Sequence, residues 1–162
     1  MSPETILLQL RLCHGLVKRN VGEVTHEESL RQPEPAGNCL NWVLGHLVAT
    51  RSAFLRGLGG EPVWTKHECQ PYDRHAPPLR DAGAARPLEE IWKAYDLTQE
   101  RLLAAVAGLT PERLAAPVPP ELRGGPAATV AELLAFLGVH DAYHTGQTGV
   151  LRRLAGKPPA DL

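Results

Sequence analysis

Two histidines, His140 and His144, stand four positions apart near the end of the chain, in the segment VAELLAFLGVHDAYHTGQTGVLRRL. The segment otherwise has the composition of a buried helix. Because an α-helix turns by about 100° per residue, positions i and i+4 share one face. Their neighbours on that face are Leu133, Phe136, Leu137, Gln147, Leu151 and Leu154. Both imidazoles are therefore predicted to point into the core, in the local arrangement that lets an HExxH helix bind one metal ion.

A third histidine, His46, lies in another helical pattern and shares its face with Cys39, Trp42, Val43, Thr50 and Ala53. Three buried imidazoles cannot all be charged, and each neutral ring needs a partner for its donor and its acceptor. One divalent cation satisfies three acceptors together and leaves a coordination position open for water or substrate. The alternative is three separate core histidines, each bonded to a backbone carbonyl or a side chain. The presence of all three favours a metal site.

Four long helical patterns must position these side chains, and the sequence shows almost no strand alternation. The first is expected over 3–20 with Ser2 as its N-cap, and the second runs from an N-cap at Asn38 to a stop at Gly59 and Gly60. The third is expected over 87–109 and the fourth over 130–155, with a short helical turn after Thr110. The predicted fold class is therefore all-α.

The connection between the second and third helices is long and rich in proline. It spans residues 59–86 and contains Trp64, His67, Tyr72, Arg74 and His75. Antiparallel neighbours in a bundle need only a few linking residues, so this length predicts a crossover that places the second and third helices parallel. An ordered segment of this kind often covers a site. The alternative is a disordered surface loop.

Composition limits the classes of function. A chain of 162 residues fits one domain, 1–162, that is large enough to fold without disulfides or a structural metal. The formal net charge of −1 gives no field that would attract nucleic acid or an anionic membrane. The three cysteines form no CxxC pair, nowhere do 18 apolar residues run together, and the start of the chain lacks a signal-peptide core. A cytoplasmic protein that binds neither membrane nor nucleic acid is expected.

Two segments resemble the DinB-like (DinB/YfiT) family. NCLNWVLGHLVATR resembles the NW-x-x-GH stretch on the second helix of these proteins, and HDAYHTGQTGVLRRLAGKP resembles the H-x-x-x-H-x-GQ stretch on their last helix. The resemblance implies a four-helix bundle with a long crossover, often homodimeric. It also implies a divalent metal held by three histidines, which carry over to His46, His140 and His144. Residues 59–128, which would shape the pocket, match poorly, so the resemblance does not indicate the substrate.

The resemblance also implies a range of activities. The family includes thiol-dependent transferases and isomerases in which the metal binds and activates a low-molecular-weight thiol such as bacillithiol, mycothiol or glutathione. A cation with neutral ligands retains its charge and lowers the pKa of a bound thiol or water, so hydrolysis of a small-molecule substrate follows from the same logic. Zinc, nickel, copper or iron suits three nitrogens. The alternative is a non-catalytic metal-binding bundle with a stress-associated or interaction role, whose metal is capped by a fourth protein ligand such as His67.

Three further residues are candidates for contacting the substrate. Gln147 lies one turn beyond His144 and either orients a ligand or bonds a neighbouring backbone group. Trp42 is either a substrate platform or a core residue, and Tyr95 needs a partner for its hydroxyl, in the site or within the core. Asp141 projects about 100° away from His140 and is not expected to bind the metal. His14, at the border of its helix's apolar stripe, is not counted as a ligand either.

The face of the last helix opposite the histidines carries small residues: Gly138, Ala142, Thr145, Gly146 and Gly149. A helix facing solvent would carry lysine or glutamate there, and each glycine costs up to about 1 kcal/mol relative to alanine. The stripe therefore predicts that another helix approaches closely, either within the bundle or across a two-fold dimer interface.

Overall fold

The computed structural model describes residues 2–79, 82–119, 122 and 127–160. Within these residues the regular secondary structure is all helical, and one isolated bridge joins Pro117 and Thr129. Four long helices make the bundle: α1 (Pro3–Val21), α3 (Leu40–Gly57), α5 (Leu88–Ala107) and α7 (Val130–Leu154). Each described helix is either too short or too polar to cross a bilayer. The prediction of an all-α bundle is confirmed.

Side-chain caps set the starts of α1 and α7, whereas the predicted cap of α3 is wrong. Ser2 accepts a hydrogen bond from the Thr5 amide at the start of α1, and Thr129 accepts one from the Glu132 amide at the start of α7. The predicted N-cap of α3, Asn38, is wrong, because the cap is Cys39, whose side chain makes no capping bond. Cys39 is fully buried. Core packing therefore decides where α3 begins.

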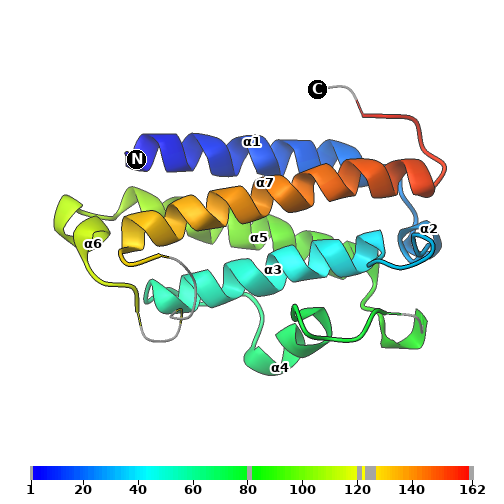
Figure 1. Cartoon of the computed structure of the whole chain (residues 1–162), viewed down its shortest axis with the longest axis horizontal. Coiled ribbons are helices and arrows are strands. Elements are labelled where there is room, and N and C mark those ends of the chain that lie inside the picture. The colour runs from blue at the N-terminus through cyan, green and yellow to red at the C-terminus, as the bar shows by residue number, and fades with distance from the viewer. Residues whose placement is uncertain (1, 80–81, 120–121, 123–126, 161–162) are drawn as a thin grey trace.

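The helices form a four-membered ring. α1 packs against α7 and α5, and α3 packs against α5 and α7. In Figure 1, α1 and α7 run in one direction along the bundle and α3 and α5 run in the other. The parallel pair α3 and α5 is the one that the long connection predicts. The site described below lies on the other contact of α3, where it meets the antiparallel helix α7.

The crossover segment between α3 and α5 folds against α3. It contains α4 (Lys66–Cys69) and two 3-10 turns, η1 (Gln70–Tyr72) and η2 (Ala82–Ala84). Trp64 and Tyr72 are buried, and the Trp64 amide donates to the Ser52 hydroxyl at 3.1 Å. The Tyr72 hydroxyl donates to the Asn41 side chain at 3.3 Å and accepts from the Arg86 amide at 3.0 Å. The described part of the segment is thus an ordered cover over one face of α3.

Small residues on α7 allow α1 to approach. A Cβ at Gly138 would overlap the Gln9 side chain, and one at Gly149 would meet the Asn20 side chain at 3.5 Å. The side-chain Nδ2 of Asn20 donates to the Thr145 carbonyl at 3.3 Å and to the Thr148 hydroxyl at 3.0 Å. The close helix contact predicted from the stripe therefore forms within the bundle. A Cβ at Gly146 would meet nothing within 4 Å, so close packing is not the reason for a glycine there.

Gly45 provides a test of how the crossover segment packs. A Cβ at Gly45 would overlap the Tyr72 ring, whereas one at Gly15, in α1, would meet nothing within 4 Å. We expect Gly45→Ala to lower the free energy of unfolding by about 1–3 kcal/mol, because the ring must move. Gly15→Ala should raise it by up to about 1 kcal/mol through helix propensity. Urea unfolding of both variants measures the difference, and a Gly45→Ala variant as stable as the wild type would contradict this packing.

Candidate metal centre

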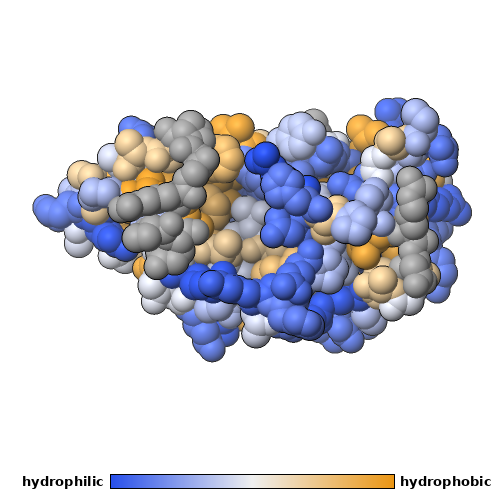
Figure 2. Space-filling view, turned by 60° about the horizontal axis from the view of Figure 1, so that its bottom comes forward, coloured by the Kyte–Doolittle hydropathy of each residue, from blue (hydrophilic) through white to orange (hydrophobic). Residues whose placement is uncertain are grey.

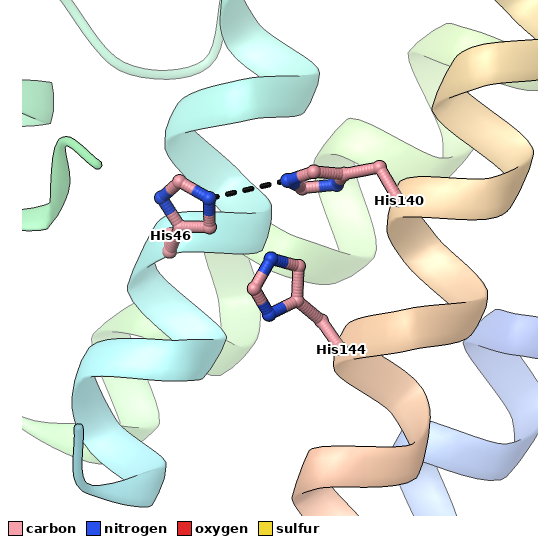
Figure 3. Close-up of side chains that lie close together, drawn as sticks. All are labelled: His46, His140 and His144. Carbon is pink, nitrogen blue, oxygen red and sulfur yellow. Dashed lines mark hydrogen bonds between the residues drawn. The ribbon is translucent and has the colours of Figure 1, made fainter. Parts of the chain in front are cut away.

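The three histidines come together where α3 meets α7. His46 projects from α3 toward α7, and His140 and His144 project from α7 toward α3 (Figure 3). The Nε2 atoms of His46 and His140 lie 3.1 Å apart, and the ring centroids of His140 and His144 are 4.4 Å apart. One nitrogen from each ring lies within 4.8 Å of the others. This spacing allows the three side chains to coordinate one ion.

Groups outside the cluster hold the rings with Nε2 facing inward. The Nδ1–H of His46 donates to the Tyr72 backbone carbonyl at 2.7 Å, and the Nδ1 of His144 bonds the Gln147 side-chain oxygen at 2.7 Å. A carbonyl oxygen only accepts, so the proton of each ring is on Nδ1 and the lone pair is on Nε2. The Nδ1 of His140 lies 3.5 Å from Oδ1 of Asp141. Histidine ligands of metals commonly have such outer partners.

Burial keeps the donors neutral. Desolvation lowers the pKa of His46, and it lowers the pKa of His144 to about 4, with the neighbouring His140 and His46 acting in the same direction. At neutral pH both rings therefore offer a lone pair. The described residues contribute no fourth histidine, cysteine or carboxylate to the group, and His67 lies exposed on α4. Three imidazole nitrogens with no fourth ligand among the described residues suit a divalent transition metal.

Of the three residues predicted to contact the substrate, two contact the histidine cluster and one is buried on α5. Gln147 bonds His144 and also donates to the Tyr143 hydroxyl at 3.3 Å. Trp42 is buried and stacks on the His46 ring, with centroids 4.8 Å apart and an angle of 8° between the planes. Tyr95 is fully buried on α5, and its hydroxyl has no hydrogen-bond partner among the described residues. Contact with a substrate remains a prediction for all three.

A buried ion pair lies beside the histidines, and the sequence patterns did not predict it. Arg51 of α3 and Asp141 of α7 are 0% and 1% exposed and bond across the helix contact at 2.7 and 3.0 Å. Asp141 is not among the residues that could share the ion with the histidines, as its direction on the helix predicted. The signal available in the sequence was Asp141, the only Asp, Glu, Lys or Arg between Glu132 and Arg152 in α7.

A cleft between α3 and the crossover segment leads to the centre. It has a volume of about 410 Å³. Thr50 lines it, and the Thr50 hydroxyl is 3.5 Å from Nε2 of His140. In Figure 2, which turns this side of the molecule forward, hydrophilic residues gather along the lower middle with more apolar surface set back behind them. The lining residues are His46, Ala49, Thr50, Ala53 and Arg56 from α3 and Lys66, Cys69, Gln70, Tyr72 and Asp73 from the crossover segment.

The buried histidines predict loss of stability in acid. Burial lowers the pKa of His14 and His144 to about 4 and also lowers that of His46 from an ordinary value of 6.5. Below pH 6.5 the unfolded chain therefore binds more protons than the folded chain. We expect the metal-free protein to keep its full stability above pH 6.5 and to lose it progressively toward pH 5, as followed by urea unfolding. His144→Gln should flatten this slope, and a constant midpoint from pH 7.5 to 5 would contradict the expectation.

Comparison with known proteins agrees with the helical-bundle fold. A model of the DinB superfamily matches residues 9–148. The crystal structure of a conserved protein from Enterococcus faecalis superposes with a TM-score of 0.77 at 16% identity, covering 97% of this chain and 99% of that one, a likeness that shows the fold alone. No curated protein matches the chain. Since the family model spans most of the sequence, the chain belongs to the DinB superfamily.

Proposed function

We propose that the protein is a metal-dependent enzyme whose three-histidine centre activates a low-molecular-weight thiol or water for transfer to a small electrophile. The observation that carries the proposal is the set of three inward Nε2 atoms with no fourth protein ligand among the described residues. A structural metal site is usually closed by four protein ligands, whereas a catalytic one keeps a position open. Zinc, nickel or iron is the expected ion.

The ion supplies the chemistry of activation: when bound, it would lower the pKa of a thiol or water at its open position. The chain supplies the surroundings. The Thr50 hydroxyl, 3.5 Å from Nε2 of His140, is placed to hydrogen-bond a nucleophile next to the histidines. Arg56 and Lys66 bring positive charge to the cleft and Asp73 brings negative charge. A cleft of about 410 Å³ accommodates a small molecule with polar or charged groups.

The alternative function, a non-catalytic metal-binding bundle, predicts a capped ion. His67, the residue that would cap it from the crossover segment, lies outside the histidine group. A homodimer remains a prediction from the family resemblance. Large apolar side chains exposed on α1 and α7 would be available for it: Leu8, Leu12, Val139, Tyr143 and Val150.

Metal content tests the proposed site directly. We expect the wild type, purified without an affinity tag, to contain one divalent ion per chain by elemental analysis. His46→Ala, His140→Ala and His144→Ala should each lose it, because two imidazoles hold an ion weakly. His67→Ala is the matched control and should retain it. A folded wild type that contains no metal and takes up neither zinc nor cobalt would overturn the proposal.

Access through the cleft is a separate prediction. Ala53→Trp should fill the cleft without touching the histidines, so the cobalt-loaded variant should keep its metal but lose the spectral change that an added thiol causes in the wild type. Ala104→Trp, on an exposed position of α5, is the matched control and should respond like the wild type. Equal thiol responses in both variants would show that the nucleophile reaches the metal by another route.

A further inference from the structure

The two carboxylate oxygens of Asp141 are bonded unequally in the ion pair with Arg51. Both Nε and Nη2 of Arg51 donate to the same oxygen of Asp141, Oδ2, and Nη1 donates to the Gln99 side-chain oxygen at 3.1 Å. The guanidinium also lies 4.3 Å from the centre of the Tyr95 ring. Arg51 is thus held on several sides. The other oxygen of Asp141, Oδ1, receives nothing from Arg51.

That second oxygen lies beside the ring of His140, a candidate metal ligand. Oδ1 of Asp141 is buried and has no hydrogen-bond partner among the described residues, and the same holds for Nδ1 of His140. The two atoms lie 3.5 Å apart. A buried carboxylate oxygen without a partner is costly. Each of these unpaired atoms is therefore best explained by the presence of the other.

Stability alone does not account for the pair. Removing two charges from water is expensive, and replacing a buried ion pair by apolar residues of similar volume is often neutral or stabilising. A role at the site accounts for it better, because Asp141 is adjacent to a candidate ligand in the sequence and Arg51 is five residues beyond His46 on the facing helix.

His140 stands between two acceptors. On one side is Nε2 of His46, at 3.1 Å, which carries a lone pair because the Nδ1–H of His46 is used by the Tyr72 carbonyl. On the other side is the carboxylate of Asp141. A single proton on the His140 ring satisfies only one of them. With a cation on the Nε2 side, the proton can stay on Nδ1, where the carboxylate accepts it.

We propose that Asp141, held in place by Arg51, is a positioning residue that orients His140 and fixes its proton on Nδ1, so that Nε2 faces the ion. This inference rests on the proposed metal site and adds a role for two residues that touch neither the ion nor the substrate. Removing such a partner typically weakens metal binding about 10- to 100-fold.

The test separates positioning from folding. The triple variant Arg51→Met, Gln99→Met and Asp141→Leu removes the ion pair and the amide that Arg51 satisfies, so no charged group is left buried alone. We expect it to fold with a melting temperature near that of the wild type, and to bind cobalt and zinc about 10- to 100-fold more weakly in competition with a chelator. Equal metal affinity in the folded variant would overturn the proposal and leave the metal site itself intact.

A second buried arginine serves as the control, and nitrogen NMR of the His140 ring gives an independent measurement. Arg152, buried near the end of α7, donates to the Gly22 carbonyl and to Glu23 at 2.9 Å, so Arg152→Met should lower the melting temperature without changing metal affinity. In the zinc-loaded wild type, nitrogen NMR of the ring should show His140 bound through Nε2 with its proton on Nδ1. Binding through Nδ1 would overturn the proposal even if the triple variant fails to fold. A wild type that binds no metal would overturn both this inference and the proposed function.

Discussion

The contact between α3 and α7 is the constraint on which the site depends. His46 and His140 are 94 positions apart in the chain, and their Nε2 atoms meet at 3.1 Å only if the two antiparallel helices keep one register. The Arg51 and Asp141 pair bonds across the same contact, five residues along α3 from His46. Slippage of either helix by one turn, about 5.4 Å, would leave both charges buried and unpaired. Because unpaired buried charges are costly, the ion pair favours the observed register of α3 and α7 over a shifted one.

The crossover segment contributes to the same geometry through one residue. Tyr72 places its ring against Gly45, its hydroxyl between Asn41 and Arg86, and its backbone carbonyl on Nδ1 of His46. The glycine leaves room for the ring, and the ring fixes where the carbonyl lies. Folding of the crossover segment is thereby linked to the tautomer of a candidate ligand. A shorter connection could join two helices, but it could not bring this carbonyl to α3.

The sequence predicts the parts of the structure that depend on helix periodicity. The shared face of His140 and His144, the inward direction of His46 and the four long helices all follow from a turn of about 100° per residue. The buried Arg51 does not, because a helix wheel assumes one covered face and α3 is covered by α5, α7 and the crossover segment. Asn38 looked like the cap because side-chain chemistry favours it, yet the buried Cys39 occupies that position. The short helix α2 (His26–Ser29) begins with a capping box between Thr25 and Glu28. Its four residues are too few to show a helical pattern of apolar residues in the sequence.

The open side of the centre follows from side-chain size along α3. The positions that follow His46 on the cleft side are Ala49, Thr50 and Ala53, and all three line the cleft. Leucine or phenylalanine at these positions would bury more apolar surface against the crossover segment, at about 25 cal/mol for each Å² removed from water. Small residues give up that stabilisation and leave the cleft beside His46 open. The opposite face of α3 carries the large apolar residues Leu44, Leu47, Val48 and Leu55, fully buried in the core. One face of α3 thus packs into the bundle core, and the other leaves a cleft beside the histidine cluster.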